Sequence, residues 1–348
     1  MNPSTKQTFF ESFENLRPIF KGIETHYSSN VVPALTELDV EREKTFTSAI
    51  LVQFFLALIG FSISALLIAE VGIFSLIIGG FITIFLMFMM WSLQTKDFVI
   101  DAKQTLIGGV VSYFGWEYAA KSAEPAVFKR LSKLRLFTGF DTKNFNDRII
   151  GTAFEKKFTL TEILLTRTET HTTTDHQGNT QTETRTVTAF NGCLISIDIP
   201  QKFQGETIVL RRGFLFNPKK IKTLKRVGLV SSKFEKVFNA YGTDQVESRY
   251  LLPPTLIEQI IAYERAFKGK GVRFAFIEDH LHIVVETGDR FEFKRLSESM
   301  LASSRIRTLL REIEAIFDLI EGLLVKEPQD WKDSFGHDAF LTKEELRS

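Results

Sequence analysis

Two long apolar stretches stand side by side in the first third of the chain. Residues 49–69 read AILVQFFLALIGFSISALLIA, residues 71–91 read VGIFSLIIGGFITIFLMFMMW, and neither contains a charged residue. As a helix, each stretch would measure about 31 Å, which is enough to cross the hydrocarbon core of a bilayer. Because only Glu70 separates them, the pattern predicts a tight hairpin of two antiparallel transmembrane helices.

Lysine and arginine flank this hairpin on one side only. Arg42 and Lys44 precede it, Lys96 and Lys103 follow it, and the turn at Glu70 has neither residue type. Short loops rich in Lys and Arg stay in the cytoplasm, so both termini are predicted to be cytoplasmic. A signal peptide is not favoured, because the first apolar stretch lies far from residue 1 and a second follows at once.

Small residues recur every four positions along both predicted spans. Such residues let helices approach closely in a membrane. The pattern favours packing within the hairpin, and packing between copies in an oligomer is the alternative. A transport path through one chain is not favoured, because neither span carries an acidic or basic residue. The small residues are Gly60, Ser64, Ser75, Gly79 and Thr83.

Helical periodicity continues on both sides of the hairpin. Residues 5–48 have apolar positions at helical spacing, with Pro18 and Pro33 as breaks, and residues 34–48 are expected to run directly into the first span. Residues 96–114 predict another helix. The next is expected to begin near Ser122, where serine, glutamate and proline precede an apolar run.

Four basic residues in that predicted helix are the candidate binding site. They alternate with Phe128, Leu131, Leu134 and Leu136, so an apolar face and a basic face are expected. The functional interpretation is contact with anionic lipid headgroups, since the segment follows the second span closely. The alternative is a basic face that is merely solvated. The candidate residues are Lys129, Arg130, Lys133 and Arg135.

From residue 147 the pattern changes to short β-rich runs, which predict an antiparallel sheet. Two runs join through a five-residue loop, 175–179. The outer part of this hairpin has little to bury and is predicted to project as an arm, either solvated or with an edge that pairs with a partner strand. The favoured register pairs Thr174 with Thr180, Thr172 with Thr182, Thr170 with Thr184, Thr168 with Thr186, His171 with Glu183, and Glu169 with Arg185.

The last third of the chain alternates between helical and strand patterns. SSKFEKVF and the segment after Pro254 predict helices, whereas VRFAFIED, HLHIVVET and DRFEFK predict three strands. Residues 298–324 predict an amphipathic helix that covers the sheet, with a dimer seam as the alternative. Residues 214–226 are basic and irregular, and are either solvated or a loop that contacts phosphate or lipid.

The predicted fold class is therefore α+β, a transmembrane hairpin followed by a cytoplasmic domain with an antiparallel sheet and covering helices. Four parts are expected: an N-terminal helical segment 1–48, the hairpin 49–91, the α+β domain 92–324 and a flexible tail 325–348.

Composition and motifs limit the classes of ligand and reaction that the sequence supports. The 43 basic and 42 acidic residues balance to a net charge of +1, which argues against a nucleic-acid partner. The sequence has no P-loop, dinucleotide-binding, zinc-protease or serine-hydrolase motif, and no cofactor is predicted. His280 and His282 could share one strand face, but no further metal ligand can be named, so no metal is predicted. Cys193 lies in an apolar run and is expected to be buried and unreactive.

The stretch from about 145 to 293 resembles a bacterial family catalogued as domain of unknown function 3137. Spacing of Phe, Gly and Pro carries this resemblance, and the hairpin and the last helix also look like that family's layout. The resemblance implies a membrane-anchored cytoplasmic α+β domain in the inner membrane of a bacterium, with no established activity. The matching runs are DRIIGTAFEKKFTLTEI, AFNGCLISIDIPQKFQGETIVL, KFEKVFNAYGTDQVESRYLLPPTLIEQI and the strand pair around VRFAFIEDHLHIVV.

Together these patterns favour a membrane-anchored binding or scaffold domain. The alternative is an enzyme that acts at the membrane surface through an unrecognised active site. The expected partners are the lipid bilayer and an unidentified protein, and a homo-oligomer is compatible with the small-residue stripes.

Overall fold

The computed structural model describes most of the chain and divides it into two compact units. One unit comprises Met1–Phe114 with Glu292–Leu309, and the other comprises Gly115–Phe291 with Leu310–Ser348. The described residues are 10, 13–15, 17–68, 72–174, 180–199, 202–212, 223–266, 271–291 and 296–324.

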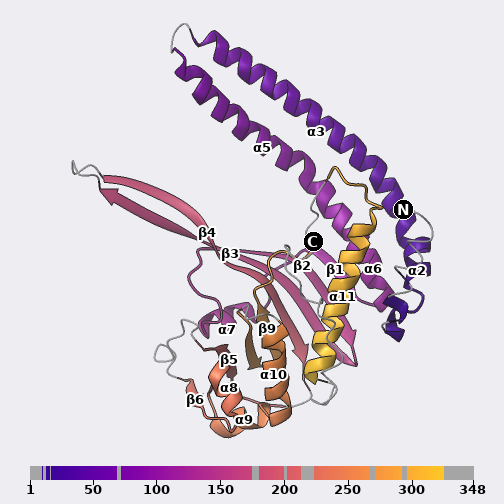
Figure 1. The fold of residues 1–348 in the computed structure, drawn as a ribbon, viewed down its shortest axis with the longest axis vertical. Helices are drawn as coiled ribbons and strands as arrows, with labels where there is room; N and C mark the ends of the chain where they lie inside the picture. The colour runs from indigo at the N-terminus through magenta and orange to yellow at the C-terminus, as the bar shows by residue number, and fades with distance from the viewer. Residues whose placement is uncertain are drawn as a thin grey trace. The chain divides into compact units, whose positions relative to one another are not determined.

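Two long apolar helices dominate the first unit. They are α3 (Val32–Leu66) and α5 (Phe74–Lys103), drawn in indigo and purple in Figure 1. Both are long and apolar enough to cross a membrane. Most of their leucine, isoleucine and phenylalanine side chains are exposed over the predicted spans. Glu70 and its two neighbours lie outside the described residues.

The small residues bring α3 and α5 together. A Cβ atom added to Gly60 would overlap Thr83, and one added to Gly79 would overlap Ser64. The Ser75 hydroxyl donates a hydrogen bond to the Ser64 carbonyl at 3.0 Å. The predicted packing within the hairpin is therefore confirmed.

Both long helices extend beyond the predicted spans. α3 begins at Val32, with Pro33 in its first turn, so the prediction that 34–48 runs into the first span is confirmed. The prediction of a separate helix over 96–114 is wrong, because α5 continues to Lys103 without a break. A π-helical turn, a short α-helical turn and a 3-10 turn then follow. These pieces are η3 (Gln104–Gly108), α6 (Gly109–Val111) and η4 (Ser112–Phe114).

The N-terminal segment packs on this extension. Its short elements are η1 (Pro18–Phe20), α2 (Ile23–His26) and η2 (Tyr27–Val31). The rings of Phe20 and Phe114 lie 5.4 Å apart, edge to face. The Tyr113 hydroxyl donates to the Lys21 carbonyl at 2.6 Å. A small aromatic core thus forms within this unit.

The second unit contains an antiparallel sheet, which confirms the predicted α+β fold class. Among the described residues it has nine strands in the order β1-β2-β3-β4-β9-β8-β5-β7-β6. The short strands β1, β6 and β7 were not expected, since a run of three to five residues without strong alternation carries little sequence signal. The strands are β1 (Glu117–Lys121), β2 (Thr142–Ala153), β3 (Lys156–Thr174), β4 (Thr180–Asp198), β5 (Thr207–Arg211), β6 (Lys225–Val227), β7 (Phe238–Gly242), β8 (Arg273–Ile277) and β9 (His280–Val285).

Helices cover both faces of the sheet. Leu194 packs with α7 (Phe128–Lys133), whereas its neighbours Cys193 and Ile195 face α11 (Ser303–Leu324). Successive strand residues point to opposite faces, so α7 and α11 lie on opposite sides. The Phe317 ring of α11 lies 4.8 Å from that of Trp116. The predicted role of the last helix as a cover for the sheet is thus confirmed.

Three further helices lie in the described part of this unit. They are α8 (Ser232–Val237), α9 (Gln245–Leu251) and α10 (Pro254–Ala266). The Ser231 and Asp244 side chains cap α8 and α9 by accepting hydrogen bonds from first-turn N–H groups. The Tyr263 hydroxyl of α10 donates to the Asp318 carbonyl of α11 at 2.6 Å.

The predicted hairpin arm is present, with the predicted register. Strands β3 and β4 extend past the rest of the sheet as a two-stranded ribbon (Figure 1). Thr174 pairs with Thr180, Thr172 with Thr182, His171 with Glu183, and Glu169 with Arg185. The loop 175–179 lies outside the described residues.

Two local predictions are wrong, and each has a hydrogen-bonding cause. The helix expected from Ser122 begins only at Phe128, since the Ser122 N–H donates to the Phe145 carbonyl and extends the pairing of β1 with β2. The start of DRFEFK is not a strand over 289–291. The Arg290 and Phe291 N–H groups donate to the Glu162 carboxylate at 2.7 and 3.1 Å instead of to a neighbouring strand.

Candidate functional site

The four basic residues proposed from the sequence lie on and just after α7. Lys129, Arg130, Lys133 and Arg135 are exposed, while Leu131 is buried against the sheet. Phe128, Leu134 and Leu136 are buried as well, so the alternation of apolar and basic positions separates into two faces as expected.

Arg130 differs from the other three. Its guanidinium forms an ion pair with Glu206, whose side chain is largely buried. The hydrogen bond to Glu206 raises the pKa of Arg130. Arg130 therefore ties α7 to the residue that precedes β5, which leaves Lys129, Lys133 and Arg135 as the better candidates for contact with an external anion.

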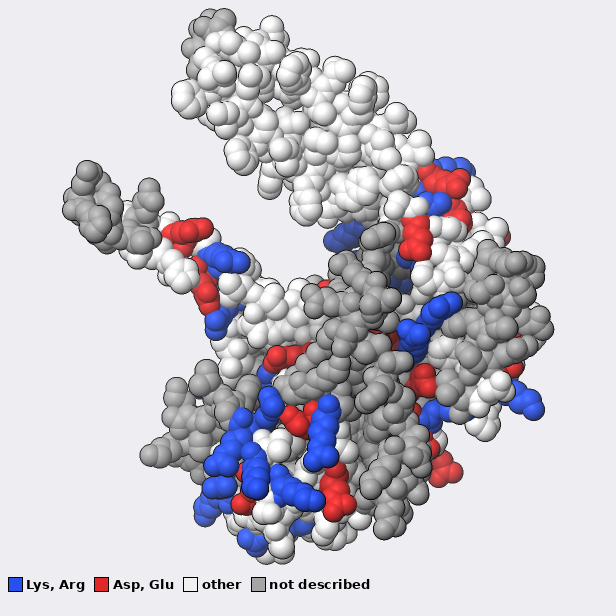
Figure 2. Space-filling model, viewed as in Figure 1, with Lys and Arg blue, Asp and Glu red and all other residues white. Residues whose placement is uncertain are grey.

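A second basic surface lies at the β6 edge of the sheet. Figure 2 shows Lys and Arg side chains gathered over the part of the unit where α8 and β6 lie. The Arg249 side chain donates to the Gly228 carbonyl at 3.2 Å and thus holds α9 against the segment that follows β6. We call the exposed residues Arg212, Lys225, Arg226, Lys233, Lys236 and Arg249 the β6-edge basic surface.

Exposed apolar side chains accompany this basic surface. Val230 precedes α8, and Val246 and Tyr250 lie one turn apart on α9; all three are exposed. The sequence pointed only to the basic loop 214–226, of which residues 213–222 lie outside the described residues.

A buried pair of carboxylates lies inside the sheet unit. Asp147 sits at a bulge in β2, where its φ of +32° turns its side chain inward, and it is 1% exposed. It accepts a hydrogen bond from the Tyr118 hydroxyl. Glu162 of β3, also buried, accepts the Arg290 and Phe291 N–H groups.

Glu162 binds its proton more tightly than an ordinary glutamate does. Burial and then the neighbouring charge of Asp147 raise the pKa of Glu162 to about 8, against the opposing effect of the two N–H groups. Burial and Asp147 also raise the pKa of Tyr118. Sequence reasoning missed this cluster, because Asp147 and Glu162 sit in strands where nothing local marks an inward-facing acid.

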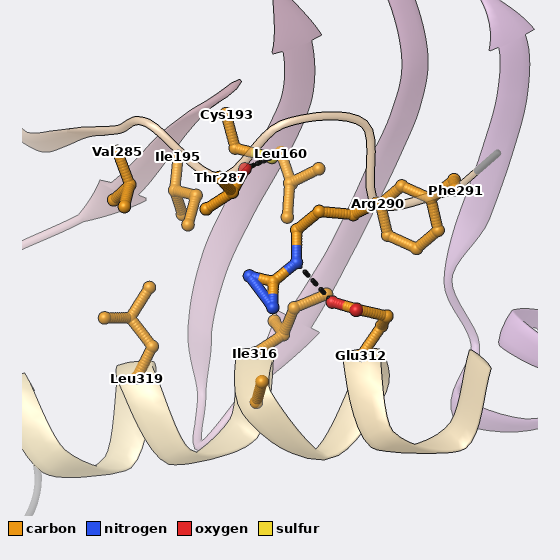
Figure 3. A pocket seen from close by; sticks show the side chains of 11 residues that line it. Leu160, Cys193, Ile195, Val285, Thr287, Arg290, Phe291, Glu312, Ile316 and Leu319 are labelled. Atoms are coloured by element: carbon orange, nitrogen blue, oxygen red, sulfur yellow. Dashed lines mark hydrogen bonds and ion pairs between the residues drawn. The ribbon is translucent and has the colours of Figure 1, made fainter. Parts of the chain in front are cut away.

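A small cavity lies between the sheet and α11 (Figure 3). Arg290 crosses it and forms an ion pair with Glu312 of α11. Leu160, Ile195 and Ile316 supply apolar walls. The cavity measures about 20 Å³, which is room for about one water molecule.

Cys193 is buried, and both His280 and His282 have polar partners within the chain. The expected burial of Cys193, followed by the charge of Glu162, raises the pKa of its thiol to about 12. His282 accepts from the Ser196 hydroxyl at 2.8 Å and donates to the Ile277 carbonyl at 3.3 Å. Burial and the nearby His280 lower the pKa of His282 to about 4. His280 instead faces Asp198, 2.9 Å away.

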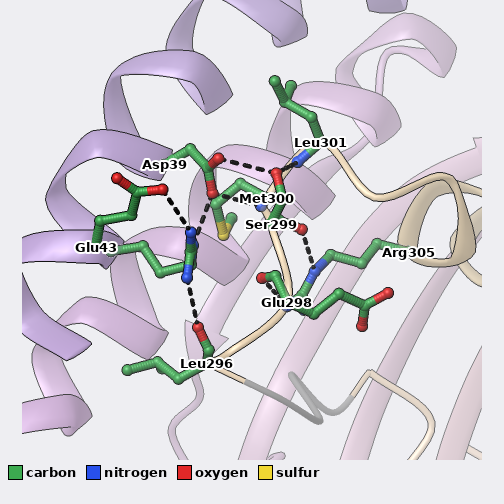
Figure 4. Close-up of polar contacts among 9 residues, drawn as sticks. Asp39, Glu43, Leu296, Glu298, Ser299, Met300, Leu301 and Arg305 are labelled. Carbon is green, nitrogen blue, oxygen red and sulfur yellow. Dashed lines mark hydrogen bonds and ion pairs between the residues drawn. The ribbon is translucent and has the colours of Figure 1, made fainter. Parts of the chain in front are cut away.

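The first unit contains a polar clasp that links α3 to the segment before α11 (Figure 4). Arg42 is 6% exposed, pairs with Asp39 at 2.7 Å and donates to the Leu296 carbonyl at 3.0 Å. Asp39 accepts the Met300 N–H at 2.7 Å and the Ser299 hydroxyl at 2.8 Å. Burial raises the pKa of Asp39, but these hydrogen bonds outweigh it and lower the pKa overall.

Comparison with known families confirms the resemblance seen in the sequence. Residues 188–324 match the DUF3137 family model, which is described as a protein of unknown function. The run DRIIGTAFEKKFTLTEI lies before this match, and the match extends through α11.

Only some of the buried polar residues described above lie within the DUF3137 match. Cys193, Arg290 and Glu312 lie inside it, whereas Asp147 and Glu162 lie before it. A solved structure, the crystal structure of the mycobacterial trehalose monomycolate transport factor A, TtfA, is similar to the chain at 9% identity and a TM-score of 0.32, over 65% of this chain and 96% of that one. No curated protein matches the chain.

Proposed function

We propose that this chain is a membrane-anchored protein whose cytoplasmic sheet unit is a binding or scaffold domain. The observation that carries the proposal is the exposed apolar surface of α3 and α5. Side chains such as Phe61, Phe81 and Phe88 are 69%, 74% and 74% exposed. Soluble proteins rarely expose apolar surface over such a length, and a bilayer would cover it.

The charge distribution around α3 and α5 supports an orientation. Lys44 precedes the apolar part of α3, and Lys96 and Lys103 end α5, so basic residues stand at the open end of the hairpin. The positive-inside rule then favours cytoplasmic termini, with Glu70 at the opposite surface of a bacterial inner membrane.

The sheet unit supports binding better than catalysis. The cavity beside Arg290 holds about one water molecule, which leaves no room for a substrate. By contrast, within the described residues β6 is an edge strand and the outer part of β4 has a strand partner on one side only, and the basic surfaces are exposed. A surface enzyme is the alternative, and it would need a larger site than this cavity.

Basic residues support contact between the sheet unit and anionic lipid. Lys129, Lys133 and Arg135 on α7 form one candidate surface, and the β6-edge basic surface forms a second. Each Lys or Arg near an anionic leaflet contributes about 1 kcal/mol of attraction. Three such residues would hold the unit at the bilayer with about 3 kcal/mol before salt screening.

A topology experiment tests the anchored, cytoplasmic arrangement. Alkaline phosphatase fused after Ser348 is expected to be inactive, because that reporter needs an oxidising compartment, whereas β-galactosidase fused at the same position is expected to be active. The chain is also expected to stay in the membrane pellet after alkaline carbonate treatment. Release by carbonate would refute the anchor, and high phosphatase activity would refute the orientation.

A further inference from the structure

The outer edge of β4 is open along the arm. β4 pairs with β3 on one side along its length, and with β9 on the other side only from Cys193 to Asp198. Beyond Cys193 the segment after β9 still covers this edge, because the Gly288 N–H donates to the Asn191 carbonyl. Within the described part of the sheet, the second edge of β4 therefore has no strand partner from Thr180 to Phe190. An edge of this length is a template for another strand, and natural proteins usually blunt or cover it.

The side chains along this edge suit a strand partner. Threonines alternate with other residues from Thr180 to Thr188, and threonine favours extended structure. Glu183 and Arg185 are exposed and stand on either side of Thr184. The edge has no proline between these limits.

The charges select one symmetric register with a second copy. Two identical edges related by a two-fold axis run antiparallel, and residues that face each other must share a sheet face. If the axis passes at Thr184, Glu183 of each copy faces Arg185 of the other. Moving the axis by one residue in either direction would set Glu183 against Glu183 or Arg185 against Arg185, which is unfavourable.

The same register pairs threonines with threonines and fits the available length. Thr182 then faces Thr186 of the second copy, and Thr180 faces Thr188, both favourable pairs. The paired stretch ends at Thr188, before β9 begins to pair at Cys193. Strand β9 therefore leaves the whole paired stretch accessible.

We propose that two copies of this chain associate through their arms, edge to edge along β4, about a two-fold axis at Thr184. The two ribbons then form a continuous four-stranded antiparallel sheet. This interaction supplies a defined surface for self-association, formed by residues that belong to neither basic surface.

Cysteine crosslinking in native membranes tests the register. With Thr184→Cys, the two thiols face each other across strands about 5 Å apart, within the range of a disulfide. Copper phenanthroline is therefore expected to convert this variant to a covalent dimer. Thr182→Cys is the matched control on the same strand and face, because its copies would lie about 13 Å apart. A mixture of Thr182→Cys and Thr186→Cys chains is expected to crosslink where neither does alone.

Charge reversal separates specific pairing from chance collision of flexible arms. On the Thr184→Cys background, Glu183→Arg or Arg185→Glu is expected to reduce the dimer about tenfold, because two favourable pairs become unfavourable. The double variant restores opposite charges between copies, although it places a second acidic side chain opposite Glu169 within the arm. Recovery of the dimer in the double variant supports the proposal. Equal crosslinking of Thr184→Cys and Thr182→Cys, or no recovery, overturns it.

Discussion

At the scale of single residues, the buried pair Asp147 and Glu162 is the most unusual chemistry in the described structure. Two carboxylates cannot both ionise at close range in a buried site without a large cost. The bulge that turns Asp147 inward places its carboxylate near that of Glu162. The raised pKa of Glu162 keeps this second carboxyl group protonated and therefore reduces the charge repulsion. The two N–H groups that Glu162 accepts tie the segment before α11 to β3.

The raised pKa of Glu162 predicts that stability falls as pH rises. The folded chain binds this proton more tightly than the unfolded chain, so its contribution is complete below about pH 4.5 and is lost as pH rises toward about 8. The loss amounts to a few kcal/mol. Glu162→Gln keeps a carbonyl oxygen for the Arg290 and Phe291 N–H groups but does not titrate, so its thermal midpoint is expected to stay nearly flat between pH 5 and 8.

The exposed Glu258 provides the control for this prediction. Glu258→Gln is expected to follow the wild-type slope when thermal unfolding of the full chain in detergent is followed by circular dichroism. A wild-type midpoint that rises steadily from pH 5 to 8 would contradict the raised pKa of Glu162.

At the scale of elements, the close approach of α3 and α5 depends on two glycines. An added methyl group at Gly79 would meet Ser64, and one at Gly60 would meet Thr83. In a membrane, helices associate chiefly by van der Waals packing, so separation of the backbones removes much of the attraction.

Adjacent glycines in α5 allow a matched comparison of this packing. Gly79→Ala is expected to destabilise the helix pair by about 1–3 kcal/mol, as overpacking does in other tight interfaces. Gly80→Ala is expected to have little effect, because nothing lies within 4 Å of the added Cβ. Thermal unfolding of each variant in detergent measures the difference. If the two variants unfold at the same temperature, close packing at Gly79 does not stabilise the pair.

At the scale of the whole molecule, a tethered domain with basic surfaces is expected to respond to lipid charge. A fluorophore on Thr138→Cys, next to α7, can report energy transfer to an acceptor lipid in nanodiscs, and the buried Cys193 leaves the labelling selective. Transfer is expected to be higher with phosphatidylglycerol than with phosphatidylcholine, and to fall at high salt as the Debye length shrinks.

Charge-removing variants then identify the surface involved. Lys129→Gln, Lys133→Gln and Arg135→Gln together are expected to abolish the lipid-dependent transfer, while the Arg130 ion pair with Glu206 is kept. Glutamine at Lys225, Arg226, Lys233 and Arg249 provides the comparison on the β6-edge basic surface. An unchanged signal in the first variant and loss in the second would assign the contact to the β6 edge. Equal energy transfer with both lipids would show that neither basic surface contacts anionic lipid.

Local patterns predicted the elements whose stability is largely local. The length and apolar character of 49–91 specified the helix pair, and the register of the arm followed from side-chain complementarity on both faces of one hairpin. The last helix followed from a repeated apolar stripe. In each case the interacting residues either lie close together in the sequence or repeat with a single period. The sequence pattern alone is therefore enough to predict the element.

Tertiary structure alone decided which distant segments meet. Arg42 reaches the Leu296 carbonyl across 254 positions of sequence. Arg290 and Phe291 leave the expected strand because Glu162, brought close by the fold, accepts their N–H groups. The sequence showed the spacing of the glycines, but it did not show which residue of the other helix each glycine contacts. The sequence by itself determined which segments are apolar, helical or extended, whereas burial and long-range hydrogen bonding, which depend on the folded path of the whole chain, determined which polar groups became clasps, proton sites and exposed basic surfaces.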